Sequence, residues 1–249
     1  MPRLFVDMAY KGSAYHGWQR QLNALSVQEV VEEALAKILP QATEIVGSGR
    51  TDTGVHASQQ IFHVDVPEGL NPDKLQYQLN ALLPFDLAIK SCRWVTPEAH
   101  ARFDAVQRGY HYHIIRQKDP FRHGMAYHYI TPLDVEKMNE AAELMCTKTD
   151  FECFSKVKTE VNTFLCTLFK AQWTEDNGNL VFYVSANRFL RGMVRAMVGT
   201  LLEVGRGKLS LADFEAILDG KNRQEAGRAV PAEGLFLSEV RYPESIYLS

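Results

Sequence analysis

The order of regular segments constrains the fold of this chain more than any other feature, because a similar order of strand and helix patterns occurs in both halves. Residues 3–10 alternate between the two faces with the period of a strand. After Ser26, which forms a capping-box pattern with Glu29, apolar residues recur at helical spacing until Pro40. A chain that alternates strands and amphipathic helices in this way buries one face of a sheet under helices.

The same two periodicities predict the remaining elements. We expect further strands at 43–46, 60–66, 87–94, 108–116, 165–173, 180–185 and 235–240, and further helices at 72–82, 134–145, 189–203 and 210–220. Together they predict an α+β protein of two similar halves, with helices packed on a mostly antiparallel sheet. We expect residues 1–105 to form the N-terminal half and residues 106–249 the C-terminal half.

Composition narrows the class of protein. With 249 residues, 46% of them hydrophobic, the chain can bury a large core as one domain or as two closely packed halves. No apolar run is long enough to span a bilayer and the first residues lack a signal-peptide pattern, so we expect a cytoplasmic protein. Four cysteines, Cys92, Cys146, Cys153 and Cys166, form no C-x-x-C pair and no zinc spacing, which predicts reduced, mostly packed thiols.

The charge distribution bears on nucleic-acid binding. A net charge of −3 argues against a protein that coats nucleic acid by bulk electrostatics, because such binding needs clustered positive charge. Basic residues do gather locally, at 188–208, where Glu203 is the one acidic residue, and at Lys148, Lys156 and Lys158. Such clusters are either solvated helix faces or parts of an RNA-binding surface.

One loop is rich in glycine and carries a carboxylate. Residues 47–54, Gly-Ser-Gly-Arg-Thr-Asp-Thr-Gly, lie between two expected strands. Glycines let a backbone turn sharply and come close to another group, which a site loop requires. Asp52 therefore either caps a turn or carries chemistry. The loop lacks the lysine and hydroxyl residue of a phosphate-binding loop and has no Rossmann fingerprint, so no nucleotide cofactor is indicated.

Arg195 and Tyr110 are further candidates. On a helical wheel Arg195 falls at the edge of the apolar stripe of 190–202, which predicts a partly buried guanidinium. Such a group favours a carboxylate partner, although a structural ion pair or a snorkelling side chain gives the same pattern. Tyr110 lies in a strand dense with rings, where it is either a core side chain or a stacking platform for an RNA base.

Other aromatic and histidine residues have simpler interpretations. His111 and His113 could be metal ligands, but no acidic residue or cysteine stands at a recognisable spacing, so we expect no metal site. Trp18, which follows Gly17, is expected to pack under a loop.

The motifs, taken together, closely resemble those of the tRNA pseudouridine synthase A (TruA) family over nearly the whole chain. The most specific is 49–57, Gly-Arg-Thr-Asp-Thr-Gly-Val-His-Ala. Further matching blocks, in the order of the family, are 10–12, 16–21, 26–28, 101–105, 108–110, 150–151 with Phe154, 193–195, Gly199, 205–207 and 231–235. The sequence departs from the usual pattern at Arg191 and Gly192 in place of Tyr-His, at Cys146 and Thr149 in place of Gly and His, and at Cys166 in place of Arg.

The resemblance implies a pseudouridine synthase fold of two similar halves with a central cleft, the N-terminal half carrying the catalytic loop. It implies that Asp52 is the catalytic aspartate and Arg195 its ion-pair partner. Arg50 would help to displace the target base, and Tyr110 would stack on that base. It also implies a homodimer without a cofactor, and uridines at positions 38 to 40 of the tRNA anticodon stem-loop as substrates.

Two other classes of function stay open at this point. A non-catalytic RNA-binding module would stack bases on the aromatic residues of the sheet and would not need Asp52. A glycosidase-like hydrolase would need a second carboxylate beside Asp52, for which Asp104 and Asp150 are the candidates.

Overall fold

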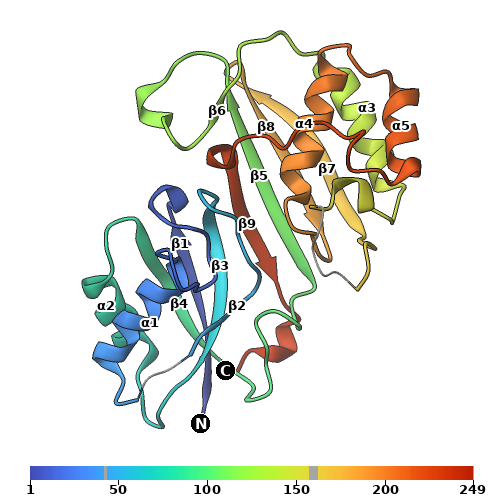
Figure 1. Ribbon diagram of the computed structural model, residues 1–249. Helices are drawn as coiled ribbons and strands as arrows, with labels where there is room; N and C mark the ends of the chain where they lie inside the picture. Colours follow the sequence, from blue (N-terminus) through green and yellow to red (C-terminus); the bar gives the residue numbers. More distant parts are fainter. Residues whose placement is uncertain (42–43, 157–161, 249) are drawn as a thin grey trace. The chain divides into compact units, whose positions relative to one another are not determined.

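The computed structural model describes residues 1–41, 44–156 and 162–248 (Figure 1). Nine strands and five α-helices lie within these residues, which confirms the predicted α+β class. The chain divides into two compact units, one formed by Met1–Gln107 with Phe236–Ser249 and the other by Arg108–Leu235. We call them unit 1 and unit 2 and describe each by itself. The division into residues 1–105 and 106–249 stays a prediction. In the structure, the C-terminal strand belongs to the same compact unit as the N-terminal residues.

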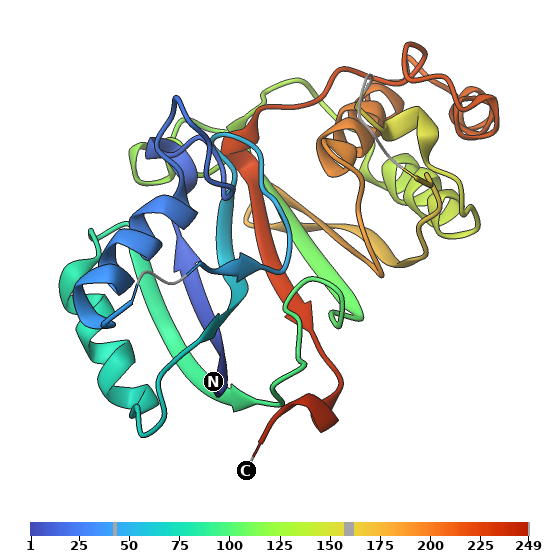
Figure 2. The same ribbon diagram turned by 60° about the horizontal axis from the view of Figure 1, so that its bottom comes forward.

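Unit 1 is a sheet with two helices on one face (Figures 1 and 2). Its strands are β1 (Arg3–Tyr10), β2 (Val46–Gly47), β3 (His56–Asp65), β4 (Leu87–Val95) and β9 (Leu235–Arg241), of which β9 enters the unit at Phe236. The order is β4-β1-β3-β9, with β2 beside β3; β9 runs parallel to β3 and the other pairs are antiparallel. The helices are α1 (Val27–Ile38) and α2 (Pro72–Leu82), and short 3₁₀ turns lie at Gly12–Ala14 and Glu244–Ile246.

Local sequence explains these elements. Alternate residues of β1, among them Leu4, Val6 and Met8, are fully buried, as the period-two pattern predicted. Helix α1 begins where Ser26 accepts a hydrogen bond from the backbone of Glu29 at 3.3 Å. Asn71 caps α2 in the same way, and Pro72 at the first helical position has no N–H that needs a partner.

Unit 2 repeats the theme of helices on an antiparallel sheet (Figure 1). Its strands are β5 (Gln107–Ile115), β6 (Tyr127–His128), β7 (Leu168–Asp176) and β8 (Asn179–Ala186), in the order β5-β8-β7 with a short parallel β6 beside β5. The helices are α3 (Val135–Cys146), α4 (Met193–Gly205) and α5 (Leu211–Gly220), and 3₁₀ turns lie at Pro120–Arg122, Glu152–Phe154 and Ala232–Gly234. Tyr112, Phe182 and Trp173, one from each main strand, are at most 2% exposed and form the core under the helices.

Several expected boundaries differ from the structure. Strand β3 begins at His56 instead of residue 60, so the end of the motif 49–57 is strand and not loop. Helix α4 begins at Met193 instead of residue 189, because Gly192 takes a left-handed conformation with φ of 72° that a helix cannot include. Strand β7 starts three residues later than predicted, at Leu168. The strand predicted at 43–46 is shorter and later in the structure, where β2 covers Val46–Gly47. Thr43, the first residue of the predicted strand, lies outside the described residues.

Helix α4 touches the segment 226–231 at one point of very close approach. A side chain at Gly199 would collide with the carbonyl group of Arg228, which is backbone and cannot rotate away. The next residue, Thr200, donates to the carbonyl of Ala196 and accepts a hydrogen bond from the N–H of Gly227 at 2.9 Å. The segment is therefore fixed to the helix by backbone contacts that need glycine at residue 199.

We predict that Gly199→Ala destabilises the protein. At an open helix position alanine would add about 1 kcal/mol of stability over glycine, but here the collision forces the backbone apart, which costs about 2–3 kcal/mol. The matched control is Gly220→Ala in α5, where the nearest foreign atom is the flexible end of Glu225 at 3.5 Å. Urea unfolding should give a lower midpoint for the first variant only, and a midpoint at or above wild type would contradict the packing at this point.

Candidate functional site

The loop between β2 and β3 carries two of the predicted site residues. Arg50 is exposed, Thr51 is buried and Asp52 is half-buried, so the side chains change from solvent to interior and back within three residues. The loop position predicted for Asp52 is confirmed, since it lies between β2 and β3. Hydrogen bonds on three sides hold this glycine-rich loop in one conformation.

A buried polar pair forms the floor of the loop. Ser48, 1% exposed, donates from Oγ to Oε1 of Gln60 at 2.7 Å, and the amide nitrogen of Gln60 donates to the carbonyl of Gly49 at 3.0 Å. The N–H of Ser48 also bonds to the carbonyl of Ile61 at 2.7 Å. Because buried polar groups are expensive to leave unpaired, these bonds fix the backbone just before Arg50.

The segment after β1 clamps the loop from the other side. The hydroxyl groups of Tyr10 and Thr51 lie 2.8 Å apart, and the N–H of Trp18 reaches the carbonyl of Thr51 at 3.4 Å. This approach requires Gly17, because a side chain there would collide with the same carbonyl, and its φ of 86° also favours glycine. The residue directly before Asp52 is thus held through both its side chain and its backbone.

The exit of the loop is held as well. The N–H of Val55 bonds to the carbonyl of Asp52 at 3.1 Å, and the N–H of Gly54 to the carbonyl of Tyr15 at 3.3 Å. His56, 1% exposed, accepts a hydrogen bond at Nδ1 from the N–H of Gly12 at 2.9 Å. The bonds of Gly54 and His56 tie the exit of the loop to the segment 10–18.

Aromatic side chains support this clamp from below. Trp18 is 1% exposed and packs between Tyr10 and Phe62, with ring centroids 6.3 and 6.0 Å away, which confirms the expectation that it packs under a loop. Tyr15 donates its hydroxyl to Asp86 at 2.8 Å. Burial, together with this carboxylate, raises the pKa of Tyr15, so the phenol stays protonated and keeps the bond.

Unit 2 contains Tyr110 and Arg195. Tyr110 lies on β5, is half-buried and meets the ring of Phe189 edge-on at 5.1 Å. Arg195 is half-buried on α4, as the helical wheel predicted, and its Nε donates to the carbonyl of Val230 at 2.7 Å. The N–H of Val230 bonds in turn to the carbonyl of Arg195 at 3.2 Å.

The segment that holds Arg195 is also attached to β5. Tyr112, two residues after Tyr110, donates its hydroxyl to the carbonyl of Pro231 at 2.8 Å, and burial raises the pKa of Tyr112. Segment 226–234 therefore connects the strand of Tyr110 to the helix of Arg195 within unit 2. Arg50 and Asp52 share one loop of unit 1, and the pairing of Asp52 with Arg195 across the two units stays a prediction.

Three residues of the basic clusters pair with nearby carboxylates. Glu203 pairs with Arg206 at 2.9 Å and with Lys208 at 3.7 Å. Lys148 pairs with Glu215 and Asp219 at 3.2 and 2.7 Å. These charges fit a solvated helix face better than a free phosphate-binding surface, and Lys158 lies outside the described residues.

Histidine and cysteine side chains are the remaining candidates for chemistry. No three His, Cys, Asp or Glu side chains within the described residues gather as a metal site would require. The four cysteines are free thiols; Cys153 and Cys166 are buried, whereas Cys146 is exposed. Burial raises the pKa of Cys92 and Cys153 to about 12 and that of Cys166 to about 11, so these thiols are poor nucleophiles.

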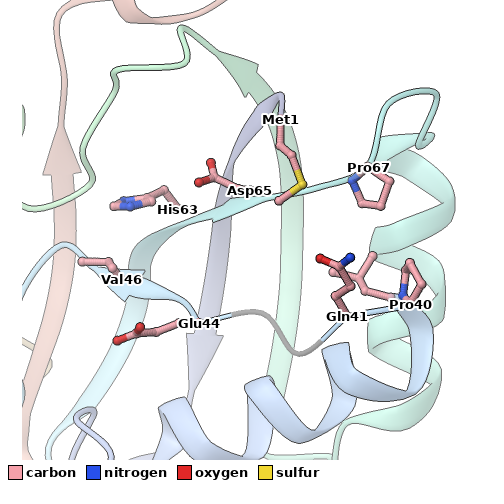
Figure 3. A pocket seen from close by; sticks show the side chains of 9 residues that line it. Met1, Pro40, Gln41, Glu44, Val46, His63, Asp65 and Pro67 are labelled. Carbon is pink, nitrogen blue, oxygen red and sulfur yellow. The ribbon is translucent and has the colours of Figure 1, made fainter.

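A cavity of about 580 Å³ lies at the other end of β3, away from the Asp52 loop (Figure 3). Its polar lining includes Glu44, His63 and Asp65. Asp65 is bound by Arg3 through two hydrogen bonds of 2.6 and 2.8 Å, and His63 accepts at Nδ1 from the N–H of Ala101. Burial lowers the pKa of His63 to about 4, so the ring is neutral at pH 7. Asp65 and His63 thus serve the structure of unit 1.

Sequence reasoning missed the residues that shape the Asp52 loop. Ser48 and Gln60 carry no pattern of their own, and Tyr10, although it opens the matched block 10–12, is otherwise a common aromatic residue of a strand. The available signal was the set of glycines at 12 and 17, which belong to the motif blocks and mark close backbone approach.

The sequence of this chain is similar to those of known proteins over nearly its whole length. The family model described as tRNA pseudouridine synthase matches residues 8–104 and 141–243. Among curated proteins, tRNA pseudouridine synthase A of Bacteroides fragilis is 50% identical over 248 residues, covering 98% of both chains. The protein of that name from Porphyromonas gingivalis is 46% identical over 100% of both chains, and that from Bacillus subtilis is 39% identical over 96% of this chain and 99% of its own.

The matched residues include the Asp52 loop, the clamp from Tyr10 to Trp18 and the helix of Arg195. On this breadth of similarity, the chain belongs to the tRNA pseudouridine synthase A (TruA) family, a family of isomerases.

Proposed function

We propose that this protein isomerises uridine to pseudouridine at positions 38 to 40 of the tRNA anticodon stem-loop, with Asp52 as the catalytic carboxylate. The observation that carries the proposal is the clamped loop, which holds a half-buried aspartate between two fixed backbone segments in a chain of this family. A catalytic group must be held close to its working geometry by packing and hydrogen bonds around it, and this loop meets that requirement.

The reaction needs no cofactor by its own balance. The bond between N1 of uracil and C1′ of ribose breaks, the base turns, and a bond forms between C5 and C1′. The proton on C5 is lost and N1 gains one, so no oxidant, reductant or external energy enters. A carboxylate serves this sequence as a nucleophile toward the sugar or the base, or by removing a ribose proton to give a glycal.

Arg50 and Tyr110 have complementary parts in this proposal. A uridine in a stem must leave its stack before its glycosidic bond can be reached, which costs on the order of a few kcal/mol. Arg50 is exposed two residues before Asp52, so it is available to enter the helix where the base was. Tyr110 offers a half-buried ring on which the displaced base can stack.

The rival hydrolase proposal is weakened by the surroundings of its second carboxylate. Asp104 accepts a hydrogen bond from the N–H of His100 at 2.6 Å and closes a local turn. Asp150 pairs with Lys221 at 2.7 Å, and this hydrogen bond lowers the pKa of Asp150, which therefore stays ionised and makes a poor general acid. Neither carboxylate fits the role of proton donor beside Asp52.

The partner, the working form and the location complete the proposal. We propose tRNA as the partner, a homodimer as the working form and the cytoplasm as the location, without a cofactor or a metal. Within the described residues, the helices are too short or too polar to span a bilayer.

Asp52→Asn should abolish turnover while leaving the fold intact. The amide keeps the size of the side chain and removes its charge, so we expect a loss of at least about 10³-fold in kcat, with tRNA affinity close to wild type. Asp176→Asn, at the exposed end of β7 in unit 2, is the control. Single-turnover assays on a tRNA transcript measure the loss, and activity within tenfold of wild type would exclude Asp52 as the catalytic residue.

Arg50→Ala should impair a paired uridine more than an unpaired one. Only a stacked and paired base requires displacement, so we expect a deficit about tenfold larger on a stem uridine than on the same uridine in an open loop. Arg241→Ala removes another exposed arginine of unit 1 and should affect neither substrate. Rates on the two matched stem-loops decide; equal deficits for Arg50→Ala would assign Arg50 to the carboxylate or to a phosphate.

Asp52 and Arg195 should be coupled in a double-mutant cycle. If the two side chains meet, the combined loss of stability in Asp52→Asn with Arg195→Met should be smaller than the sum of the single losses by about 1 kcal/mol or more. The lost bond to Val230 is common to both arms of the cycle and cancels. Arg206→Met, which breaks a pair with Glu203 at the C-terminal end of the same helix, serves as a control that should be additive with Asp52→Asn. Additive losses for Arg195 would show that it pairs elsewhere.

A further inference from the structure

The connection between β5 and β6 in unit 2 forms a projecting loop (Figure 1, light green). It runs from Arg116 to Ala126 and turns through the 3₁₀ segment Pro120–Arg122. None of the residues to which we assign chemistry lies in it. Its sequence, Arg-Gln-Lys-Asp-Pro-Phe-Arg-His over 116–123, alternates cations with an aromatic ring.

Hydrogen bonds fix both the base and the tip of this loop. At the base, the N–H of Arg116 bonds to Oδ1 of Asn179 at 3.4 Å and its guanidinium to the carbonyl of Ile130 at 3.3 Å. Ala126, 4% exposed, closes the other end of the loop. At the tip, Asp119 accepts a hydrogen bond from the N–H of Phe121 at 2.9 Å.

The fixed tip holds an aromatic ring in solvent. Phe121 is 92% exposed, and Met125 and Ile130, which follow it along the chain, are 37% and 70% exposed. Exposed apolar side chains are common on protein surfaces and by themselves show no function. This ring differs from other exposed rings in its cationic neighbours, since Lys118 and Arg122 flank it within three residues.

The local charge is opposite to that of the whole chain. Arg116, Lys118 and Arg122 face one carboxylate in this loop, that of Asp119, whereas the net charge of the protein is −3. Asp119 uses Oδ1 on the backbone of Phe121, and its other oxygen stands 3.9 Å from Nε of Arg122, whose side chain is 45% exposed. Arg122 therefore keeps most of its charge available to a partner in solution.

We propose that the loop 116–126 is an RNA-contact element, in which Phe121 stacks on an unpaired base of the tRNA while Lys118 and Arg122 bind the neighbouring phosphates. An exposed ring beside cations is what single-stranded or looped nucleotides require, because the ring replaces base stacking and the cations neutralise the backbone. A second copy of this chain fits less well, because two such loops would bring like charges together. The inference rests on the proposed function and adds to it a contact outside the catalytic residues.

Unit 1 offers a matched control. Phe85 is fully exposed and also follows a proline, but the next residue is Asp86 instead of an arginine. Pro84-Phe85-Asp86 and Pro120-Phe121-Arg122 thus present the same ring with opposite charge beside it. Exposure of a ring is common to both, and the cationic neighbours belong only to the proposed contact.

The test measures affinity and chemistry separately on the full-length protein. Dissociation constants for an unmodified tRNA transcript, measured by fluorescence anisotropy, should rise about 5- to 20-fold for Phe121→Ala and less than twofold for Phe121→Tyr and Phe85→Ala. The double variant Lys118→Ala with Arg122→Ala should lower the slope of log Kd against log salt by roughly 1.5, as expected for two lost phosphate contacts. The loss in kcat/KM should exceed any loss in kcat.

The outcomes separate this inference from the proposed function. If the wild-type protein modifies tRNA and Phe121→Ala binds it as tightly as wild type, the inference is wrong and the proposed function stands. If the wild-type protein makes no pseudouridine, the proposed function is wrong, while the anisotropy measurements still decide the contact. A loss of affinity that coincides with dissociation of a wild-type oligomer in sedimentation would assign the loop to self-association and overturn the inference.

Discussion

The hold on Thr51 is the interaction on which the candidate site depends. Its hydroxyl lies 2.8 Å from that of Tyr10, and its carbonyl receives the N–H of Trp18 across a gap that only Gly17 permits. Without these contacts a loop with three glycines would sample many conformations, and the carboxylate of Asp52 would have no fixed direction. The clamp turns flexible sequence into a defined position, because the residue beside Asp52 cannot move without breaking buried bonds.

In unit 2, too, an irregular segment is held in place by hydrogen bonds from buried and half-buried side chains. There the segment 226–234 connects β5 to α4 through the carbonyls of Pro231 and Val230, which accept bonds from Tyr112 and Arg195. Gly199 allows the helix and the segment to touch. In both units a candidate side chain lies next to an irregular segment whose backbone groups are satisfied by buried partners. Such support is what allows loops to carry function on a rigid scaffold.

Sequence patterns predicted the regular elements well and the supporting contacts poorly. Helix α2 begins and ends at the residues expected from Pro72 and its apolar spacing, and Ser210 and Asp213 form the capping box that opens α5. Helix α4 was predicted to begin four residues too early, since Leu190 is buried and fits the apolar stripe although Gly192 breaks the helix. Periodicity reports which side chains are buried, but it does not report backbone conformation.

The site shows the same division. The glycine-rich loop and the half-burial of Arg195 were predictable, because each follows from residues close together in sequence. The bonds from Tyr10 to Thr51 and from Ser48 to Gln60 join residues 41 and 12 positions apart. No local pattern encodes such pairs, so they became visible only with the fold. The interpretation of the basic clusters also depended on the fold, since the carboxylates that pair with Lys148 lie on α5, far from it in sequence.

The central claim, that this clamped aspartate loop belongs to an enzyme that isomerises tRNA uridines, is tested most directly on an unmodified tRNA transcript. After incubation with the protein alone, the mass of the RNA should be unchanged. Carbodiimide labelling of this RNA, followed by reverse transcription, should then give stops at positions 38 to 40. Release of free uracil, with a matching loss of mass, would indicate a hydrolase. Binding without any carbodiimide-reactive product would reduce the protein to an RNA-binding module, and either result would contradict the account.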